Sequence, residues 1–246
     1  MIFLEKKYTQ RRGSLLLKRF DVVLLDADET IFDFKRAEAY SLEQSMEEFG
    51  YEFTPERLKL YSEINLACWK AMERGELKSG RLTSLRFEKF FEAMGERIPD
   101  CAAFHNSYIH NLADAGFLID GALEFVEKLH KYCKVYIATN GLTIAQRGRL
   151  RRSAIGPYID GIFISEEIGF QKPTKEYFDT IFNKLGIEDK SRVIMVGDSL
   201  TSDMQGGRNA GITTCRYLGD HPHEDSDLVD FEITSYDEFF DILFKN

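Results

Sequence analysis

A run of four apolar residues, 22–25, leads directly into two carboxylates, Asp26 and Asp28, and this stretch constrains the chain more than any other. A short run rich in Val and Leu is typical of a buried strand in an α/β sheet. Because strand side chains alternate between faces, Asp26 and Asp28 leave the strand on the same side. In open α/β sheets, ligands bind where the strands end. Two carboxylates there repel one another unless a cation lies between them or one is protonated. The stretch therefore predicts a functional site. The alternative is a solvated turn or a helix cap.

The remaining chain predicts a parallel α/β sheet with a helical insertion. Further strands are expected at 134–139, 162–165, 192–198 and 213–218, with a possible sixth at 231–233, and helices at 121–132, 142–153, 173–185, after 198 to 209, and 236–244. Strands that alternate with helices of about ten residues form βαβ units. Helical periodicity alone is found between about 34 and 108, in segments 36–49, 55–75, 82–95 and from Pro99 onward.

The sequence therefore predicts an α/β, Rossmann-like three-layer sandwich with a parallel sheet and an inserted all-helical domain. We expect residues 1–33 and 109–246 to form the core domain and residues 34–108 to form a helical cap at the active-site end of the sheet. Residues 1–19 precede the first core strand, and the sequence leaves open whether they are a loose extension or an extra edge strand.

Polar residues also stand at the ends of other predicted elements. Thr139 and Asn140 end one strand and precede Gly141, and they are able to donate hydrogen bonds to an anion. Lys172 precedes Pro173, which we place in the first turn of a helix, where a cation and a helix N-terminus both attract anions. The alternative for 139–141 is an ordinary strand-to-helix turn, and the alternative for Lys172 is a solvated surface lysine.

Two further carboxylates complete the set. Asp198 stands at the end of the strand 192–197, as Asp26 does at the end of its own strand, and Asp203 follows five residues later. For Asp203 a helix-cap role remains open, because it falls near the start of the next predicted helix.

These four segments, in this chain order, resemble the motifs of the haloacid dehalogenase superfamily of phosphoryl-transfer enzymes. The matching residues are Asp26-Ala27-Asp28-Glu29-Thr30, Thr139-Asn140-Gly141, Lys172-Pro173, and Gly197-Asp198 with Asp203. The resemblance extends over the chain from about residue 20. Ala27 and Glu29 occupy variable positions, where the family often has a bulky apolar residue and Asp.

The resemblance implies a role for each residue. Asp26 would be the nucleophile that forms an aspartyl-phosphate, and Asp28 the general acid and base. Mg²⁺ would be held by the side chains of Asp26 and Asp198 and by the backbone carbonyl of Asp28. Thr139, Asn140 and Lys172 would hold the phosphoryl group of the substrate, and Asp203 would support Lys172 or a metal-bound water.

A second Asp at the position of Asp28 distinguishes the phosphatases of this superfamily from its dehalogenases. The dehalogenases lack this residue, because their reaction has no leaving alcohol to protonate. We therefore expect a phosphatase for small phosphate monoesters. The cap segment with Trp69, Arg86 and Phe87 resembles that of the nucleotidases that clear noncanonical pyrimidine monophosphates. These three side chains are candidates to contact a base, or else Trp69 and Phe87 belong to the cap core and Arg86 to the surface.

The sequence leaves three hypotheses for the function open. The first is a Mg²⁺-dependent 5′-nucleotidase that acts on noncanonical pyrimidine nucleoside monophosphates. The second keeps the chemistry and changes the substrate, as in a phosphoglycolate or sugar-phosphate phosphatase or a β-phosphoglucomutase-like phosphomutase. The third is a non-catalytic, receiver-like protein, which would have no use for Asp28.

Composition limits the partners. The 246 residues carry a formal charge of −9, which argues against a nucleic acid polymer or an anionic membrane as a partner. The nearest two of the four cysteines are over thirty residues apart, and we expect reduced thiols in a cytoplasmic protein. We expect a small-molecule partner and a monomer or homodimer.

Overall fold

The computed structural model describes residues 9–11 and 14–244, and it divides into two compact units. We call the first the sheet unit; it contains the described residues up to Phe32 together with 118–140 and 155–244. We call the second the helical unit; it contains 33–117 and 141–154. Within the described ranges, no helix combines the length and apolar character that a membrane-spanning segment needs.

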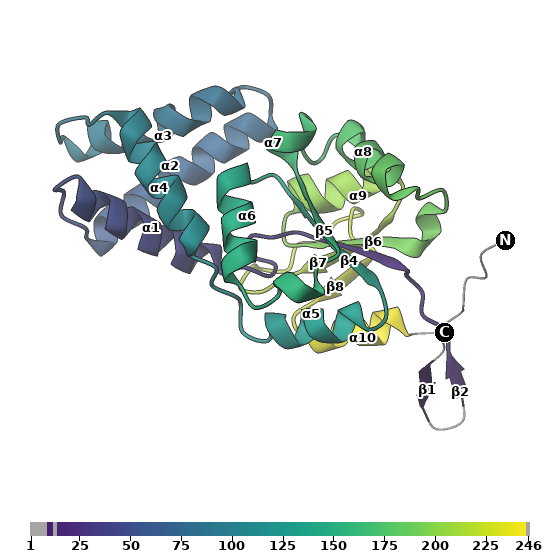
Figure 1. Cartoon of the computed structure of the whole chain (residues 1–246). Coiled ribbons are helices and arrows are strands. Elements are labelled where there is room, and N and C mark those ends of the chain that lie inside the picture. Colours follow the sequence, from purple (N-terminus) through teal and green to yellow (C-terminus); the bar gives the residue numbers. More distant parts are fainter. Residues whose placement is uncertain (1–8, 12–13, 245–246) are drawn as a thin grey trace. The chain divides into compact units, whose positions relative to one another are not determined.

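The sheet unit is built on six parallel strands (Figure 1). The strands are β3 (Val22–Leu25), β4 (Lys134–Thr139), β5 (Gly161–Ile164), β6 (Val193–Gly197), β7 (Thr213–Tyr217) and β8 (Phe231–Ile233). Their spatial order is β5-β4-β3-β6-β7-β8, and every neighbouring pair is parallel. This order reverses direction at β3, which makes the carboxyl end of β3 the place where a ligand is expected to bind.

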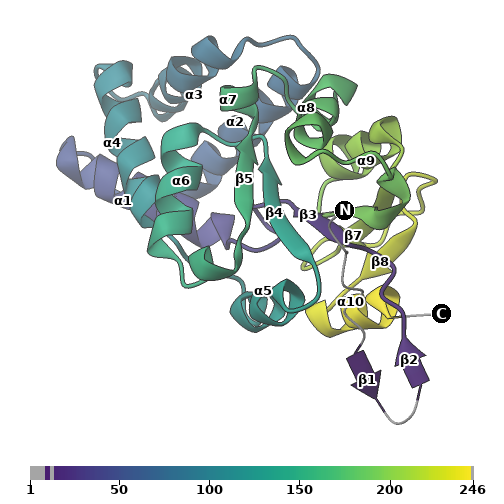
Figure 2. The ribbon, with the colours of Figure 1, turned by 45° about the vertical axis from the view of Figure 1, so that its right-hand side comes forward.

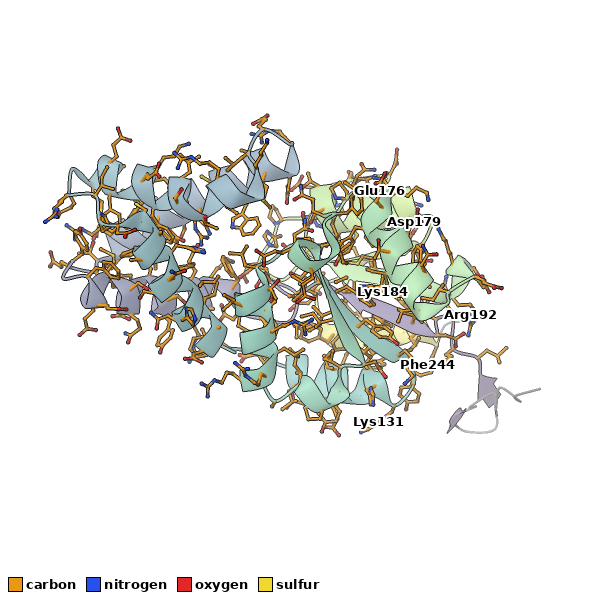
Figure 3. All side chains as sticks on the ribbon, turned by 45° about the horizontal axis from the view of Figure 1, so that its top comes forward. Lys131, Glu176, Asp179, Lys184, Arg192 and Phe244 are labelled. Carbon is orange, nitrogen blue, oxygen red and sulfur yellow. The ribbon has the colours of Figure 1, made fainter. Side chains whose placement is uncertain are left out.

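Helices cover both faces of this sheet (Figures 1 and 2). One face carries α5 (Ala122–His130) and α10 (Tyr236–Leu243), and the other carries α8 (Lys175–Leu185) and α9 (Gln205–Ala210). The apolar side of α8, with Tyr177, Phe178 and Ile181, packs on β3 and β6 residues. Its opposite side carries Glu176, Asp179 and Lys184 (Figure 3). The predicted α/β, Rossmann-like fold is confirmed, because a parallel sheet lies between two helical layers.

The helical unit consists of five helices among its described residues. They are α1 (Phe34–Glu48), α2 (Pro55–Glu73), α3 (Ser79–Met94), α4 (Cys101–Asp114) and α6 (Thr143–Arg152). The predicted start of α2 is confirmed, since Thr54 caps the helix and Pro55 occupies its first turn. Aromatic side chains from α2, α3 and α4 form the core of this unit. The predicted insert 34–108 lies inside this unit, which also takes in the end of α4 and all of α6.

Several predicted boundaries are corrected by the structure. α8 begins at Lys175, two residues after Pro173, and the Lys172–Pro173 bond is cis. The segment after Asp198 first forms a π-helical turn, Leu200–Met204, and α9 begins only at Gln205. Ser165 opens the short helix α7 (Ser165–Ile168) and does not extend β5. α4 starts at Cys101, after the cap residue Asp100, and not at Pro99.

The N-terminal segment pairs with itself. β1 (Thr9–Arg11) and β2 (Ser14–Leu16) form a separate two-stranded antiparallel sheet, so the described part of 1–19 adds no edge strand to the main sheet. Residues 1–8 and 12–13, which belong to the same predicted extension, lie outside the described residues. The four cysteines are free and buried, as expected for reduced thiols.

Candidate active site

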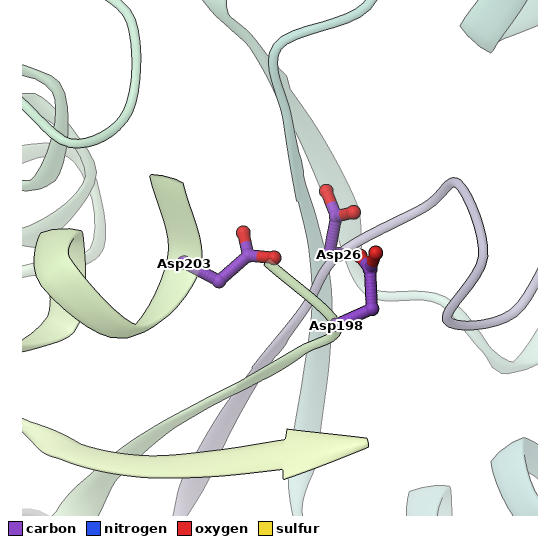
Figure 4. Close-up of side chains that lie close together, drawn as sticks. All are labelled: Asp26, Asp198 and Asp203. Carbon is purple, nitrogen blue, oxygen red and sulfur yellow. The ribbon is translucent and has the colours of Figure 1, made fainter. Parts of the chain in front are cut away.

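Three aspartates converge at the carboxyl ends of β3 and β6 (Figure 4). Asp26 directly follows β3, Asp198 directly follows β6, and Asp203 lies in the π-helical turn after β6. Each offers a carboxylate oxygen, and these oxygens all lie within 4.8 Å of one another. The convergence follows from the topology, because β3 and β6 are adjacent parallel strands and therefore end at the same edge of the sheet.

Lys172 lies beside this cluster and is buried. Its Nζ is 2.5 Å from Asp26 Oδ1, 2.6 Å from Asp203 Oδ1 and 2.7 Å from the Ala138 carbonyl oxygen. A lysine ammonium has three N–H donors, so these contacts use all of them. The expectation that Lys172 stands beside a helix N-terminus is wrong, since α8 starts later; carboxylates, and not a helix end, surround its charge.

The cluster shifts the pKa of each of its buried members. Burial and the neighbouring charge of Asp203 raise the pKa of Asp26 well above its usual value, although Lys172 opposes this. Burial likewise raises the pKa of Asp203 to about 6, against the pull of Lys172. Burial alone would lower the pKa of Lys172, but Asp203 and Asp26 outweigh it and raise that pKa, so the side chain stays charged.

These shifts predict how stability depends on pH. Folded Asp26 and Asp203 hold protons more tightly than the unfolded chain does, so the free energy of unfolding should fall as pH rises from about 4. For Asp203 the fall should be complete above its folded pKa of about 6. Urea midpoints of the metal-stripped protein between pH 4 and 8 would measure this slope. Asp203→Asn should flatten it, and a slope equal in both proteins would contradict the prediction.

The residue types fit a hard divalent cation. Three carboxylates face a single ammonium group, which leaves an excess of negative charge in a largely buried place. Oxygen ligands from one or two carboxylates are what Mg²⁺ takes in proteins that also bind phosphate groups. Asp26 and Asp198 would hold such an ion, and Asp203 offers a third carboxylate close to both.

The loop after β3 carries Asp28, which is half-buried. The backbone N–H groups of Ile31 and Phe32 both donate to the carbonyl of Ala27 and so close a tight turn. Within this turn Glu29 adopts a φ of 56°, a left-handed conformation that is rare outside glycine and costs ~1–3 kcal/mol. Glu29 directly follows Asp28, so strained backbone adjoins the predicted acid.

Thr139 and Asn140, at the carboxyl end of β4, have different surroundings. Thr139 is the last residue of β4 and is buried, next to Ala138, whose carbonyl accepts from Lys172. The Asn140 side chain accepts from the backbone N–H of Lys172 at 2.8 Å and donates to its carbonyl at 2.9 Å. The sequence predicts that Asn140 binds the substrate. In the structure its side chain holds the backbone of Lys172, a contact that no local sequence pattern predicted.

Asn140→Ala should therefore loosen the segment that carries Lys172. The change leaves two backbone groups of Lys172 without their partners, and we expect a loss of about 1–3 kcal/mol in unfolding free energy together with lower turnover. Urea unfolding and steady-state kinetics would measure both. Asn183→Ala, on an exposed position of α8, is the control and should change neither. A stable, fully active Asn140→Ala protein would remove this positioning role.

The Asp203 carboxylate contacts both Lys172 and the backbone of Ser199. Besides Lys172, its carboxylate accepts from the backbone N–H of Ser199, while Ser199 itself is the cap of the π-helical turn. Asp203 is thus not the cap residue, although it does close the turn. Gly197 makes room for it, because a Cβ on Gly197 would lie 2.3 Å from Asp203 Oδ2.

Gly197→Ala should push the Asp203 carboxylate away from Lys172. Overpacking of this kind costs ~1–3 kcal/mol, and we expect turnover to fall with stability. Gly80→Ala is the matched control, since a Cβ there meets nothing within 4 Å. Thermal unfolding and turnover of the two variants would be compared, and equal behaviour would show that Gly197 is not needed at this contact.

Asp198 has partners that the sequence did not predict. Arg216 Nε donates to the Asp198 carbonyl at 3.1 Å, and His221 Nε2 lies 3.3 Å from Asp198 Oδ2. Neither residue belongs to a motif, so no local signal pointed to it.

The cap residues singled out in the sequence lie in the helical unit. Phe87 is fully buried among Tyr61, Phe104 and Tyr108, so it belongs to the core. Arg86 is also buried, contrary to a surface role, and donates to Asn65 Oδ1 at 3.0 Å. Trp69 packs on a small cluster formed by Cys68, Met72 and Leu82.

A cavity of about 530 Å³ lies at the opposite ends of β6, β7 and β8 and contains none of the predicted residues. Two of its cations are already paired, Lys190 with Asp179 at 3.7 Å and Arg208 with Asp230 at 3.0 Å. We place the candidate phosphate site beside Lys172, because Asp26 and Asp198 meet there and no motif residue lines this cavity.

Comparison with known proteins agrees with this geometry. Residues 20–211 match the family model of haloacid dehalogenase-like hydrolases. The chain is 35% identical to the HAD-hydrolase YfnB of Bacillus subtilis, with 92% of this chain and 97% of YfnB aligned. It is 34% identical to the pyrimidine 5′-nucleotidase PynA of Streptococcus pneumoniae, over 92% of this chain and 96% of PynA. It is 31% identical to the pyrimidine 5′-nucleotidase YjjG of Escherichia coli, over 93% of this chain and all of YjjG.

Solved structures give the same result. The crystal structure of magnesium-bound YfnB matches with a TM-score of 0.86 at 34% identity and covers 92% of this chain and 99% of that one. A dehalogenase crystal structure matches with a TM-score of 0.72 at 17% identity, which shows a shared fold. The family model, the full-length relatives and the shared fold together show that this chain is a hydrolase and belongs to the haloacid dehalogenase-like hydrolase family.

Proposed function

We propose that this chain hydrolyses the 5′-phosphate of pyrimidine nucleoside monophosphates, including noncanonical ones, through an aspartyl-phosphate on Asp26. The observation that carries the chemistry is the buried contact of Lys172 with Asp26 and Asp203 at the ends of β3 and β6. The substrate class rests on two relatives named pyrimidine 5′-nucleotidases, each aligned over nearly its whole length.

The proposed reaction has two steps. In the first, a carboxylate oxygen of Asp26 bonds to phosphorus while the bond from phosphorus to the nucleoside oxygen breaks, and Asp28 gives its proton to that oxygen. In the second, Asp28 takes a proton from water, the water oxygen bonds to phosphorus, and Asp26 is released with inorganic phosphate. A carboxylate that attacks a phosphate dianion meets like charge, and Lys172 offsets part of that repulsion.

Mg²⁺ bound by Asp26, Asp198 and the backbone carbonyl of Asp28 would supply the remaining charge neutralisation. Thr139, buried at the end of β4, is a proposed contact of the phosphoryl oxygens. The Lys172 ammonium is the other, and it would reach them by exchanging one of the three contacts that it makes in this structure. Asp203 keeps Lys172 in place through its 2.6 Å contact.

A substrate panel tests the proposal. Phosphate release would be measured from pyrimidine and purine nucleoside 5′-monophosphates, phosphoglycolate and sugar phosphates, with Mg²⁺ and with EDTA. We expect the highest kcat/KM for pyrimidine monophosphates and none of this activity with EDTA. Faster turnover of a sugar phosphate would overturn the nucleotidase assignment, and accumulation of an isomer without free phosphate would indicate a phosphomutase. No turnover of any ester would favour a receiver-like protein.

The acid role of Asp28 has its own test. Asp28→Asn should nearly abolish hydrolysis of a nucleoside monophosphate, whose leaving alkoxide needs a proton. The same change should reduce aspartyl-phosphate formation from p-nitrophenyl phosphate much less, because nitrophenolate is able to leave without receiving a proton. A burst of nitrophenol in rapid-mixing experiments would show this first step, and equal losses with both substrates would exclude Asp28 as the acid.

A further inference from the structure

Asp198 is the member of the aspartate cluster whose orientation Lys172 does not explain. The three N–H groups of Lys172 are matched by Asp26, Asp203 and the Ala138 carbonyl. The Asp198 side chain is 17% exposed and stands at the end of β6, where strand pairing has ceased to fix it. A ligand to a divalent cation must nevertheless be held in one orientation, so the contacts that hold Asp198 have to come from elsewhere.

Two side chains from β7 and the segment after it supply such contacts. Arg216 pairs with Gly197 in the β6–β7 register, which brings its side chain alongside Asp198. Its Nε donates to the Asp198 carbonyl at 3.1 Å, and the side chain is 4% exposed. This contact fixes the backbone of Asp198 from the neighbouring strand.

His221 contacts the carboxylate itself. The backbone N–H of His221 donates to the Leu218 carbonyl at 2.7 Å, which closes a turn directly after β7. This turn places His221 Nε2 3.3 Å from Asp198 Oδ2, a longer separation than a typical N–H···O hydrogen bond. The carboxylate therefore has a polar neighbour on one oxygen, while Asp198 also offers an oxygen to the cluster with Asp26 and Asp203.

We propose that His221 and Arg216 are positioning residues for metal binding, which hold Asp198 in the orientation that a divalent cation requires. The inference rests on the proposed function, because it takes Asp198 as a Mg²⁺ ligand. Polar groups that contact a metal ligand from outside the coordination shell orient it, and their removal typically weakens metal affinity ~10–100-fold. The segment after β7 thus contributes to the site although it carries none of the four motifs.

The experiment compares two histidines of the same segment. His221→Ala is expected to weaken Mg²⁺ binding about 10-fold, measured by calorimetry on the metal-stripped full-length protein. His223→Ala is the control, because His223 contacts Glu232 at 2.6 Å and Asp225 at 3.1 Å and is mostly exposed. His221→Gln retains an amide N–H near the carboxylate and should keep most of the affinity.

Kinetics separate positioning from general damage. For His221→Ala we expect the Mg²⁺ concentration for half-maximal activity to rise in parallel with the calorimetric Kd. At saturating Mg²⁺, kcat should remain within about twofold of the unchanged protein. Arg216→Lys, which retains the charge but not the Nε contact, should shift the same Mg²⁺ midpoint. Unchanged Mg²⁺ affinity in both His221→Ala and Arg216→Lys would overturn the inference.

Asp198→Asn separates a failure of the proposed metal site from a failure of the positioning role. If it abolishes Mg²⁺ binding while His221→Ala and Arg216→Lys bind normally, the proposed site stands and the positioning role fails. If Asp198→Asn itself binds Mg²⁺ normally, the proposed metal site fails, and the positioning role fails with it.

Discussion

Asp26→Asn is expected to lower turnover by about 10⁴-fold or more, because it removes the atom that bonds to phosphorus. The change keeps the size of the side chain, and it removes a carboxylate whose charge is disfavoured by burial and by Asp203. The fold should therefore persist, with an unfolding temperature close to that of the unchanged protein. Steady-state kinetics on the best nucleotide and thermal unfolding would measure the two effects.

Asp241→Asn, on the exposed side of α10, is the control for the loss of one carboxylate. It should leave both turnover and stability unchanged. Mass spectrometry of the unchanged protein quenched during turnover should show a mass increase of one phosphoryl group, which Asp26→Asn should lack. Near-normal activity of Asp26→Asn would remove the nucleophile assignment.

Lys172→Met should have the largest effect on stability. The side chain is 2% exposed and lies between two carboxylates, which would be left buried without their cation. Removing one partner of a buried ion pair typically lowers the free energy of unfolding by ~3–5 kcal/mol. Turnover should also fall by about 10²-fold or more, because the positive charge opposite the phosphoryl group is lost. Urea unfolding and kinetics at saturating Mg²⁺ would measure the change.

Lys175→Met is the matched control, because Lys175 is 59% exposed and pairs with Asp179 one helical turn away. Exposed pairs of this kind contribute ~0–1 kcal/mol, so its unfolding midpoint should barely move. Adding Asp203→Asn to Lys172→Met should restore part of the lost stability, since one unpaired carboxylate disappears. A stable and active Lys172→Met protein would show that neither the fold nor the chemistry depends on this ammonium.

The elements with long or regular patterns were predictable from local sequence. The strand at 134–139 and the start of α2 at Pro55 agree with the structure because apolar periodicity and capping residues lie within a few positions of one another. The turn after Lys172 was not predictable in this way. Lys172, which precedes this turn, is held by contacts with Asn140, Asp26 and Asp203, which are far away in the sequence.

The same distinction holds for the site. Asp26, Asp28, Thr139, Lys172 and Asp198 were predicted as site residues because each lies at a strand end or belongs to a motif. The positioning contacts of Asn140 and Arg216 were not, because an amide or a guanidinium that bonds to a distant backbone leaves no periodic signal. Arg86 shows another limit. The sequence left open whether it contacts a base or lies on the surface, and the structure buries it against Asn65.

The sequence by itself determined the order of strands and helices, the parallel sheet and the identity of the residues at the strand ends, because these depend on side-chain type and short-range spacing. Only the tertiary structure decided which of those residues meet. The reversal of strand order at β3 brings Asp26 beside Asp198 and carries Lys172 between two carboxylates. Burial there then sets their pKa values, since both the loss of water and the approach of like charges arise only when distant segments pack together.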